Sequence, residues 1–83
     1  MRKNQQHRKQ EALISLGAVL RHRRIELALT QDEVGKAAGL HRTYVTDVEN
    51  GLRNVSFLTL KRIATALQCP LSLIIGDTEN HKE

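Results

Sequence analysis

Apolar residues recur at intervals of three and four along most of the chain, and this is the spacing of one face of an α-helix. Leucines at 13, 16, 20, 27 and 29 indicate a first helix over residues 13–28. β-Branched residues never alternate with polar ones over more than a few positions, and proline occurs only once, at Pro70. The pattern therefore predicts an all-α domain of five helices without strands.

The second helix has the clearest start signal in the chain. Thr30 is placed to accept a hydrogen bond from the backbone N–H of Glu33, and the Glu33 carboxylate is placed to accept one from the N–H of Thr30. This arrangement is a capping box, which satisfies two backbone donors at a helix start. Gly39 would end the helix by taking the left-handed conformation, so the helix is about eight residues long.

Three more helices follow from the same kinds of signal. The third spans residues 42–50 and is ended by Gly51. Ser56 is a good N-cap for the fourth helix, whose apolar residues continue to Leu67. The fifth spans residues 70–75, is apolar nearly all round, and is closed by Gly76.

Charge and polarity divide the chain of 83 residues into three parts. Residues 1–12 are polar and basic and lack an apolar stripe, so they are predicted to form a mobile basic arm. The folded domain covers residues 13–76, and residues 77–83 form a polar tail. Residues 1–24 carry seven basic side chains against one acidic one, which indicates a polyanionic partner, either nucleic acid or an anionic membrane surface.

The second and third helices form the motif that indicates a function. Two short helices joined by a turn that contains glycine make a helix-turn-helix, here at about residues 30–50. In the third helix Val45 and Val48 point inward. The opposite face offers short hydrogen-bonding groups and one arginine, which suits contact with base edges in the major groove, through Arg42, Thr43, Thr46, Asp47 and Asn50.

Individual side chains on this helix have more than one interpretation. The guanidinium of Arg42, in the first turn, can donate two hydrogen bonds to O6 and N7 of guanine. A threonine methyl can pack on a thymine methyl. Asp47 either accepts a hydrogen bond from cytosine N4 or repels wrong bases and supports Thr43. Glu49 follows Val48 near the inward edge, so a structural ion pair is favoured over DNA contact.

The sequence over about residues 16–75 resembles the Cro/C1-type (XRE-like) helix-turn-helix family of lambdoid phage repressors. Residues 24–34, Gly39 and residues 44–51 carry this resemblance, which implies a five-helix, lambda-repressor-like fold. A further set is more similar still to controller proteins of restriction–modification systems, small stand-alone dimers that activate and repress their own operon. That set is Arg42, Thr43, Tyr44, Val45, Glu49, Gly51, Arg53 and Asn54.

The resemblance also implies roles for single residues. Arg24 and Glu49 would pair inside the domain, and Gln31 would clamp a phosphate. His41 departs from the family pattern, which usually has a small hydroxyl or acidic residue at this cap, so His41 either contacts phosphate or is a weak cap. Arg53 would hold the backbone and can reach a base as well. The implied DNA-backbone contacts are Gln31, His41, Tyr44, Arg53 and Asn54.

Other chemistry is not indicated by the sequence. The four histidines are too scattered for a metal site, and the single cysteine, Cys69, cannot complete one. The chain has no glycine-rich phosphate loop and no paired carboxylates on one element, so an enzyme, a cofactor and a small-molecule ligand are not expected. It has no transmembrane run or signal peptide, so a cytoplasmic protein without a membrane partner is expected. Phe57 is expected to pack in the core.

The fifth helix predicts self-association. Its apolar side chains cover nearly every direction, so a partner must bury those that the domain does not: Leu71, Leu73, Ile74 and Ile75. The expected function is a transcriptional regulator that binds an inverted-repeat operator in double-stranded DNA as a homodimer. Regulation would come from blocking or recruiting RNA polymerase, a candidate partner, or from binding a neighbouring copy on an adjacent DNA site. Alternatives are an antitoxin-type autorepressor, a phage-type repressor, and, with less support, a protein-interaction module.

Overall fold

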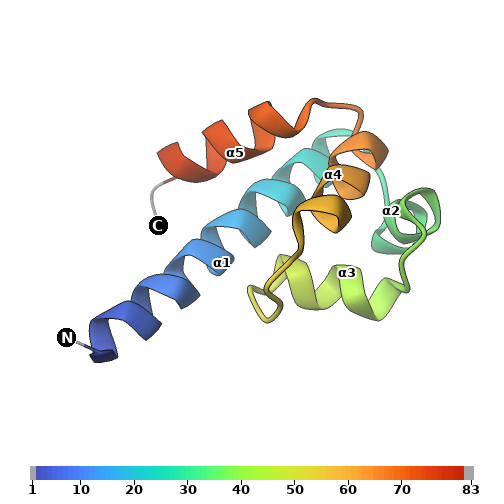
Figure 1. Ribbon diagram of the computed structural model, residues 1–83. Coiled ribbons are helices and arrows are strands. Elements are labelled where there is room, and N and C mark those ends of the chain that lie inside the picture. Colours follow the sequence, from blue (N-terminus) through green and yellow to red (C-terminus); the bar gives the residue numbers. More distant parts are fainter. Residues whose placement is uncertain (1, 82–83) are drawn as a thin grey trace.

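The computed structural model describes residues 2–81, with side chains from residue 9 onward. Within this range every regular element is a helix, which confirms the all-α fold. The helices are α1 (Arg2–Glu26), α2 (Gln31–Ala38), α3 (Arg42–Glu49), α4 (Phe57–Ala66) and α5 (Leu71–Asn80). In Figure 1 α5 runs back along α1, while α2 and α3 lie together on the other side of α4.

One apolar core joins all five helices. α1 packs against α3 and α5, and α2 packs against α3 and α4. The most buried side chains are those of Leu67, Ile74 and Val34, each 1% exposed. The remaining core residues are Val19, Leu20, Ala38, Val45, Val48, Leu60, Ile63 and Ala64.

None of the helices in residues 2–81 is long and apolar enough to cross a membrane by itself. Taken as a pair, α4 and α5 meet that criterion by length and composition, but they are bent at 102° to each other.

α1 begins earlier than the predicted start at residue 13. α1 begins at Arg2, so residues 2–12 are helical and continuous with the packed part of the helix. These residues include no glycine or proline and are rich in arginine, lysine and glutamine, which favour helix. Extending a helix that is already nucleated costs far less than starting one. The N-terminal half of α1 extends beyond the other helices (Figure 1). Met1 of the predicted arm lies outside the described residues.

The C-terminal end of α1 comes earlier than predicted. The helix ends at Glu26, whereas the leucine spacing placed its end at residue 28. Ala28 has a φ of 56°, in the left-handed region, and the backbone N–H of Leu29 donates to the Arg24 carbonyl at 3.1 Å. The chain therefore turns at an alanine where a glycine would be the usual signal.

α5 is longer than predicted and includes most of the expected polar tail. Gly76 does not close it, because this glycine is helical and is not among the residues with positive φ. The Thr78 hydroxyl donates to the Ile74 carbonyl at 2.7 Å, and the helix continues to Asn80. Packing of α5 on α1 supports these turns. Residues 82–83 of the predicted tail lie outside the described part of the chain.

The exposure of α5 corrects part of the predicted dimer surface. Ile74 is 1% exposed and belongs to the domain's own core, so its assignment to the dimer interface is wrong. Leu71 is half-buried against the same core. Leu73 and Ile75, on either side of Ile74, are each 41% exposed. Leu73 lines a surface hollow together with Ala18 and His22 of α1.

Phe57 also differs from its prediction. It was expected to pack in the core, but its side chain is 65% exposed at the first turn of α4. Leu60, three positions on, takes the buried place on that helix.

Gly17 marks a close approach between α1 and α3. A β-carbon at this position would overlap the backbone carbonyl oxygens of Val48 and Glu49 at the end of α3. Backbone atoms cannot turn away as the end of a flexible side chain can. Gly76 provides the contrast, because a β-carbon there would meet nothing within 4 Å.

Alanine at these two glycines is expected to have opposite effects on stability. Gly17→Ala should lower the free energy of unfolding by about 1–3 kcal/mol, because α1 and α3 must separate. Gly76→Ala should raise it by about 0.5–1 kcal/mol, because alanine loses less backbone entropy in a helix. Urea denaturation of both variants measures the difference, and equal effects would contradict the close approach at Gly17.

Candidate nucleic-acid interface

The turn between α2 and α3 fixes how α3 is presented. The capping box at the start of α2 is formed as predicted, with Glu33 N–H donating to Thr30 at 3.0 Å and Thr30 N–H donating to Glu33 at 2.8 Å. Gly39 closes α2 with a φ of 71°. The N–H of Leu40 then donates to the Gly35 carbonyl at 2.7 Å, which holds the turn against α2. These hydrogen bonds fix α2 and α3 in a helix-turn-helix arrangement.

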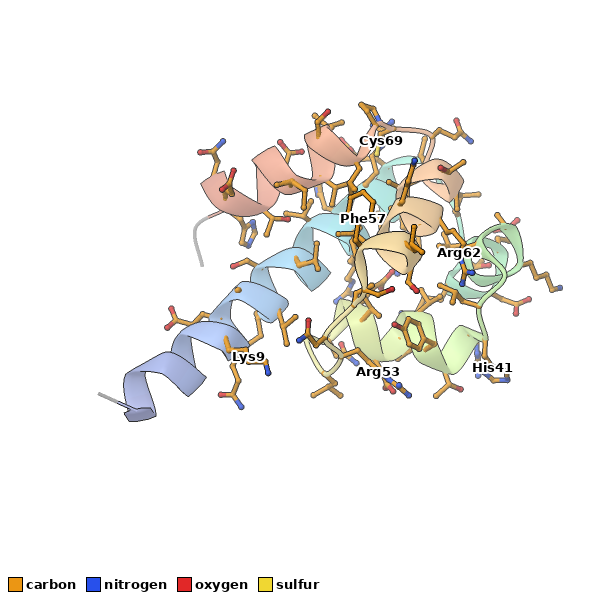
Figure 2. The ribbon with its side chains drawn as sticks, in the orientation of Figure 1. Lys9, His41, Arg53, Phe57, Arg62 and Cys69 are labelled. Atoms are coloured by element: carbon orange, nitrogen blue, oxygen red, sulfur yellow. The ribbon has the colours of Figure 1, made fainter. Side chains whose placement is uncertain are left out.

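α3 has one buried face and one that meets solvent. Val45 and Val48 are 3% and 2% exposed, as their spacing predicted. The predicted base-contact residues lie away from the core: Arg42, Thr43 and Asn50 are exposed, and Thr46 and Asp47 are half-buried. In Figure 2 His41 and Arg53 lie at opposite ends of α3, along the same edge of the molecule.

His41 caps α3 through its side chain. Its Nδ1 accepts a hydrogen bond from the backbone N–H of Thr43 at 3.1 Å. Nδ1 must carry no hydrogen to accept this bond. His41 thus acts as the N-cap, while its exposed ring remains at the end of the helix that is predicted to face DNA.

The ion pair between Arg24 and Glu49 is present and bidentate. Arg24 Nε donates to Glu49 Oε2 at 2.7 Å, and Arg24 Nη2 donates to Oε1 at 3.0 Å. The two side chains are 13% and 4% exposed. Hydrogen bonding to Glu49 raises the pKa of Arg24 above its ordinary value, against the opposing effect of burial. Arg24 also donates to the Leu29 carbonyl at 2.8 Å, so the pair ties together α1, α3 and the start of α2.

Gln31 has a structural role that the sequence did not indicate. Its Nε2 donates to Glu49 Oε1 at 3.0 Å, and its Oε1 accepts from the Thr46 hydroxyl at 2.6 Å. The residue predicted to clamp a phosphate is thus also the link between the buried ion pair and the exposed face of α3. The sequence offered only an indirect indication of this role: a buried carboxylate such as that of Glu49 needs more than one hydrogen-bond donor.

Asp47, Arg53 and Tyr44 form a second group on the same side. Arg53 Nε lies 3.6 Å from Asp47 Oδ2, and the Arg53 guanidinium carbon lies 4.8 Å from the centre of the Tyr44 ring. The loop after α3 is shaped by Gly51, with a φ of 74°, and by the Leu52 N–H, which donates to the Asp47 carbonyl at 2.9 Å. Neither interpretation of Asp47 from the sequence included this ion pair.

Several polar groups of the face remain available to a ligand. Across residues 9–81, no hydrogen bond or ion pair engages the side chains of Arg42, Thr43, Asn50 or Asn54. Arg42 and Gln31 line the same surface hollow beside the start of α2. Within the described residues no three histidine, cysteine or acidic side chains are grouped so as to hold a metal ion. The surface therefore offers hydrogen-bond donors and one free guanidinium to a polar, anionic partner.

Comparisons with known proteins agree with this geometry. The family model described as Helix-turn-helix matches residues 20–74. The ImmF control region 10 kDa protein of Bacillus phage phi105 is 42% identical over 59 residues, which are 71% of this chain and 66% of that protein. The chain thus spans just under two thirds of that relative's length. Control protein C.MunI of a Mycoplasma species is 39% identical over 51 residues, 61% of this chain and 69% of that protein.

A solved structure shows the same likeness in three dimensions. The restriction-modification controller protein C.AhdI from Aeromonas hydrophila superposes with a TM-score of 0.74 at 37% identity, over 75% of this chain and 94% of that chain. Fold and site together define a DNA-binding helix-turn-helix domain. The chain belongs to the XRE-type helix-turn-helix family of transcriptional regulators.

Proposed function

We propose that this protein is a sequence-specific regulator of the restriction–modification controller kind, which binds an inverted-repeat operator as a homodimer. The observation that carries the proposal is Arg42 in the first turn of α3, which is exposed and which no hydrogen bond or ion pair within residues 9–81 engages. Recognition helices contact base edges mainly through their N-terminal residues, and an arginine fork pairs with O6 and N7 of guanine.

The residues around α3 suit the DNA backbone. His41 caps the start of the helix, and Arg53, in the loop after the helix, holds its guanidinium against the Tyr44 ring. Gln31 uses one amide N–H on Glu49, which leaves its second N–H for a phosphate oxygen. With Asn54, these residues would set the register of the protein on the duplex, while Arg42, Thr43, Thr46 and Asn50 face the bases.

A dimer supplies the specificity that one domain lacks. One recognition helix touches only a few base pairs, and two-fold symmetry joins two half-sites about 10 base pairs (~34 Å) apart. Leu73 and Ile75, each 41% exposed on α5, are the proposed contacts between protomers. No catalytic activity, cofactor or small-molecule ligand is proposed for the chain. Its site of action would be DNA in the cytoplasm, with RNA polymerase as a candidate partner.

A phage-type repressor is the second candidate function. Two relatives come from Bacillus phage phi105, and one of them is named as an immunity repressor protein, at 34% identity over 70 residues. Both candidates use the same DNA-binding face and differ in the genes they control.

A charged side chain at Leu73 of α5 tests the dimer. Wild-type protein is expected to sediment as a dimer at micromolar concentration, and Leu73→Lys as a monomer with weaker operator binding, because a buried lysine would lack a partner. Leu58→Lys is the matched control, since Leu58 is 70% exposed on α4 and lies outside the proposed contact. A monomeric wild type that binds one half-site as tightly as the full repeat contradicts the proposal.

A further inference from the structure

Four side chains form a continuous hydrogen-bonded chain from the core to the recognition face. It begins at Arg24, which holds both oxygens of Glu49 at 2.7 and 3.0 Å. Glu49 Oε1 also accepts from Gln31 at 3.0 Å, and Gln31 accepts from the Thr46 hydroxyl at 2.6 Å. Glu49 is only 4% exposed, so its position does not depend on solvent.

The charge of Glu49 sets the direction of every bond in this chain. A carboxylate accepts hydrogen bonds and cannot donate them, so Gln31 must turn its amide nitrogen toward Glu49. The other end of the same amide group, the carbonyl oxygen, then faces Thr46. A carbonyl oxygen only accepts. Thr46 therefore has to donate its hydroxyl proton inward.

A second hydrogen-bond acceptor lies beside the Thr46 hydroxyl and leads to the same result. The Thr46 hydroxyl oxygen is 3.1 Å from the backbone carbonyl oxygen of Arg42, one turn earlier in α3. Both neighbours of the hydroxyl are acceptors, and a hydroxyl has one proton. Whichever neighbour receives it, that proton is used inside the protein and is not available to a base.

With its proton used inside the protein, Thr46 can offer DNA its methyl, and its hydroxyl oxygen only as an acceptor. Thr46 is half-buried and lies one turn after the exposed Arg42 in α3. In the major groove the C5-methyl of thymine is the apolar feature that a threonine methyl can contact. We propose that Thr46 is a specificity-determining residue that recognises a thymine methyl, with its orientation fixed by Gln31 and Glu49. This inference rests on the proposed DNA-binding function.

Replacing thymine by uracil, which lacks only that methyl, tests the inference directly. In the operator selected by wild-type protein, each symmetric pair of thymines is replaced by uracil in turn. One pair is expected to lower the affinity about sixteen-fold, or about four-fold in each half-site, because one buried methyl is lost.

Two nearly isosteric variants identify the protein group involved. Thr46→Val keeps the methyl and loses the hydroxyl, so it should retain the uracil effect at that thymine. Thr46→Ser keeps the hydroxyl and loses the methyl, so it should bind thymine and uracil operators equally. Thr65→Ser, at an exposed threonine of α4 outside the proposed DNA-binding face, is the control and should leave the effect at that thymine unchanged. Thermal denaturation of each variant separates a loss of folding from a loss of recognition.

The outcomes distinguish this inference from the function on which it rests. A wild-type protein that selects no DNA sequence contradicts the proposed function and the inference together. A protein that selects an operator, but in which Thr46→Ser keeps the uracil effect and Thr46→Val loses it, contradicts only the methyl assignment. An operator in which no thymine responds to uracil also overturns it.

Discussion

Replacing Glu49 by alanine is expected to lower the free energy of unfolding by about 3–5 kcal/mol, the usual loss when one partner of a buried ion pair is removed. Arg24, 13% exposed, would keep its charge without a counterion, and Gln31 would lose its acceptor. Arg24→Ala should have a loss of similar size, because it leaves the Glu49 carboxylate buried and partly unpaired. Chemical denaturation of the two variants measures both losses.

The double variant and a surface control complete this test. Arg24→Ala with Glu49→Ala should lose less than the sum of the single losses, because neither charge is left alone. Glu26→Ala is the control: Glu26 pairs with His22 at 3.6 Å on the surface of α1, and the two side chains are 53% and 77% exposed. Its loss should stay below about 1 kcal/mol. Strict additivity of the two buried substitutions would contradict a direct interaction.

Replacing Arg42 by alanine is expected to abolish discrimination at one base pair, most simply a guanine. The loss should be about 1–3 kcal/mol in each half-site. The fold should be unaffected, because Arg42 is exposed and no hydrogen bond or ion pair within residues 9–81 engages it. Binding to a panel of operators with single base-pair changes measures the lost preference, and the melting temperature checks the fold.

Arg53 provides the matched comparison for Arg42. Its guanidinium is held by Asp47 and Tyr44 in the loop after α3, at the edge of the recognition face. Arg53→Ala should weaken binding to all sequences more evenly and reduce the salt dependence, as expected for a phosphate contact. If Arg42→Ala kept its full preference at every position, α3 would not be the helix that reads the sequence.

The parts of the fold that could be predicted from the sequence are those with local signals. The capping box at Thr30, the left-handed Gly39 and the cap at Ser56 each act within one turn, and all are present. The C-terminal ends of α1 and α5, which were predicted at other residues, lack such a local signal. α1 ends at Glu26, and the left-handed residue of the turn that follows is an alanine, Ala28. α5 passes through Gly76 because packing on α1 supports the next turns.

In the candidate site, too, the contacts with a sequence signal could be predicted, and those that depend on tertiary packing could not. Periodicity placed Glu49 at the inward edge of α3, and the family resemblance added Arg24 as its partner, which the structure confirms. The bridge through Gln31 could not be predicted, because it depends on how three helices meet around one carboxylate. The ion pair between Asp47 and Arg53 depends on the shape of a loop, which hydrophobic spacing does not describe.

Selection of binding sites from a random pool of double-stranded DNA by wild-type protein is the most direct test of sequence reading by α3. The expected result is an enriched inverted repeat, with half-sites about 10 base pairs apart and an affinity that falls steeply with salt. In the same selection Arg42→Ala should lose the preference at one symmetric position of the repeat. A pool with no enriched sequence, or an enriched site that Arg42→Ala selects unchanged, would contradict the assignment of α3 as the recognition helix.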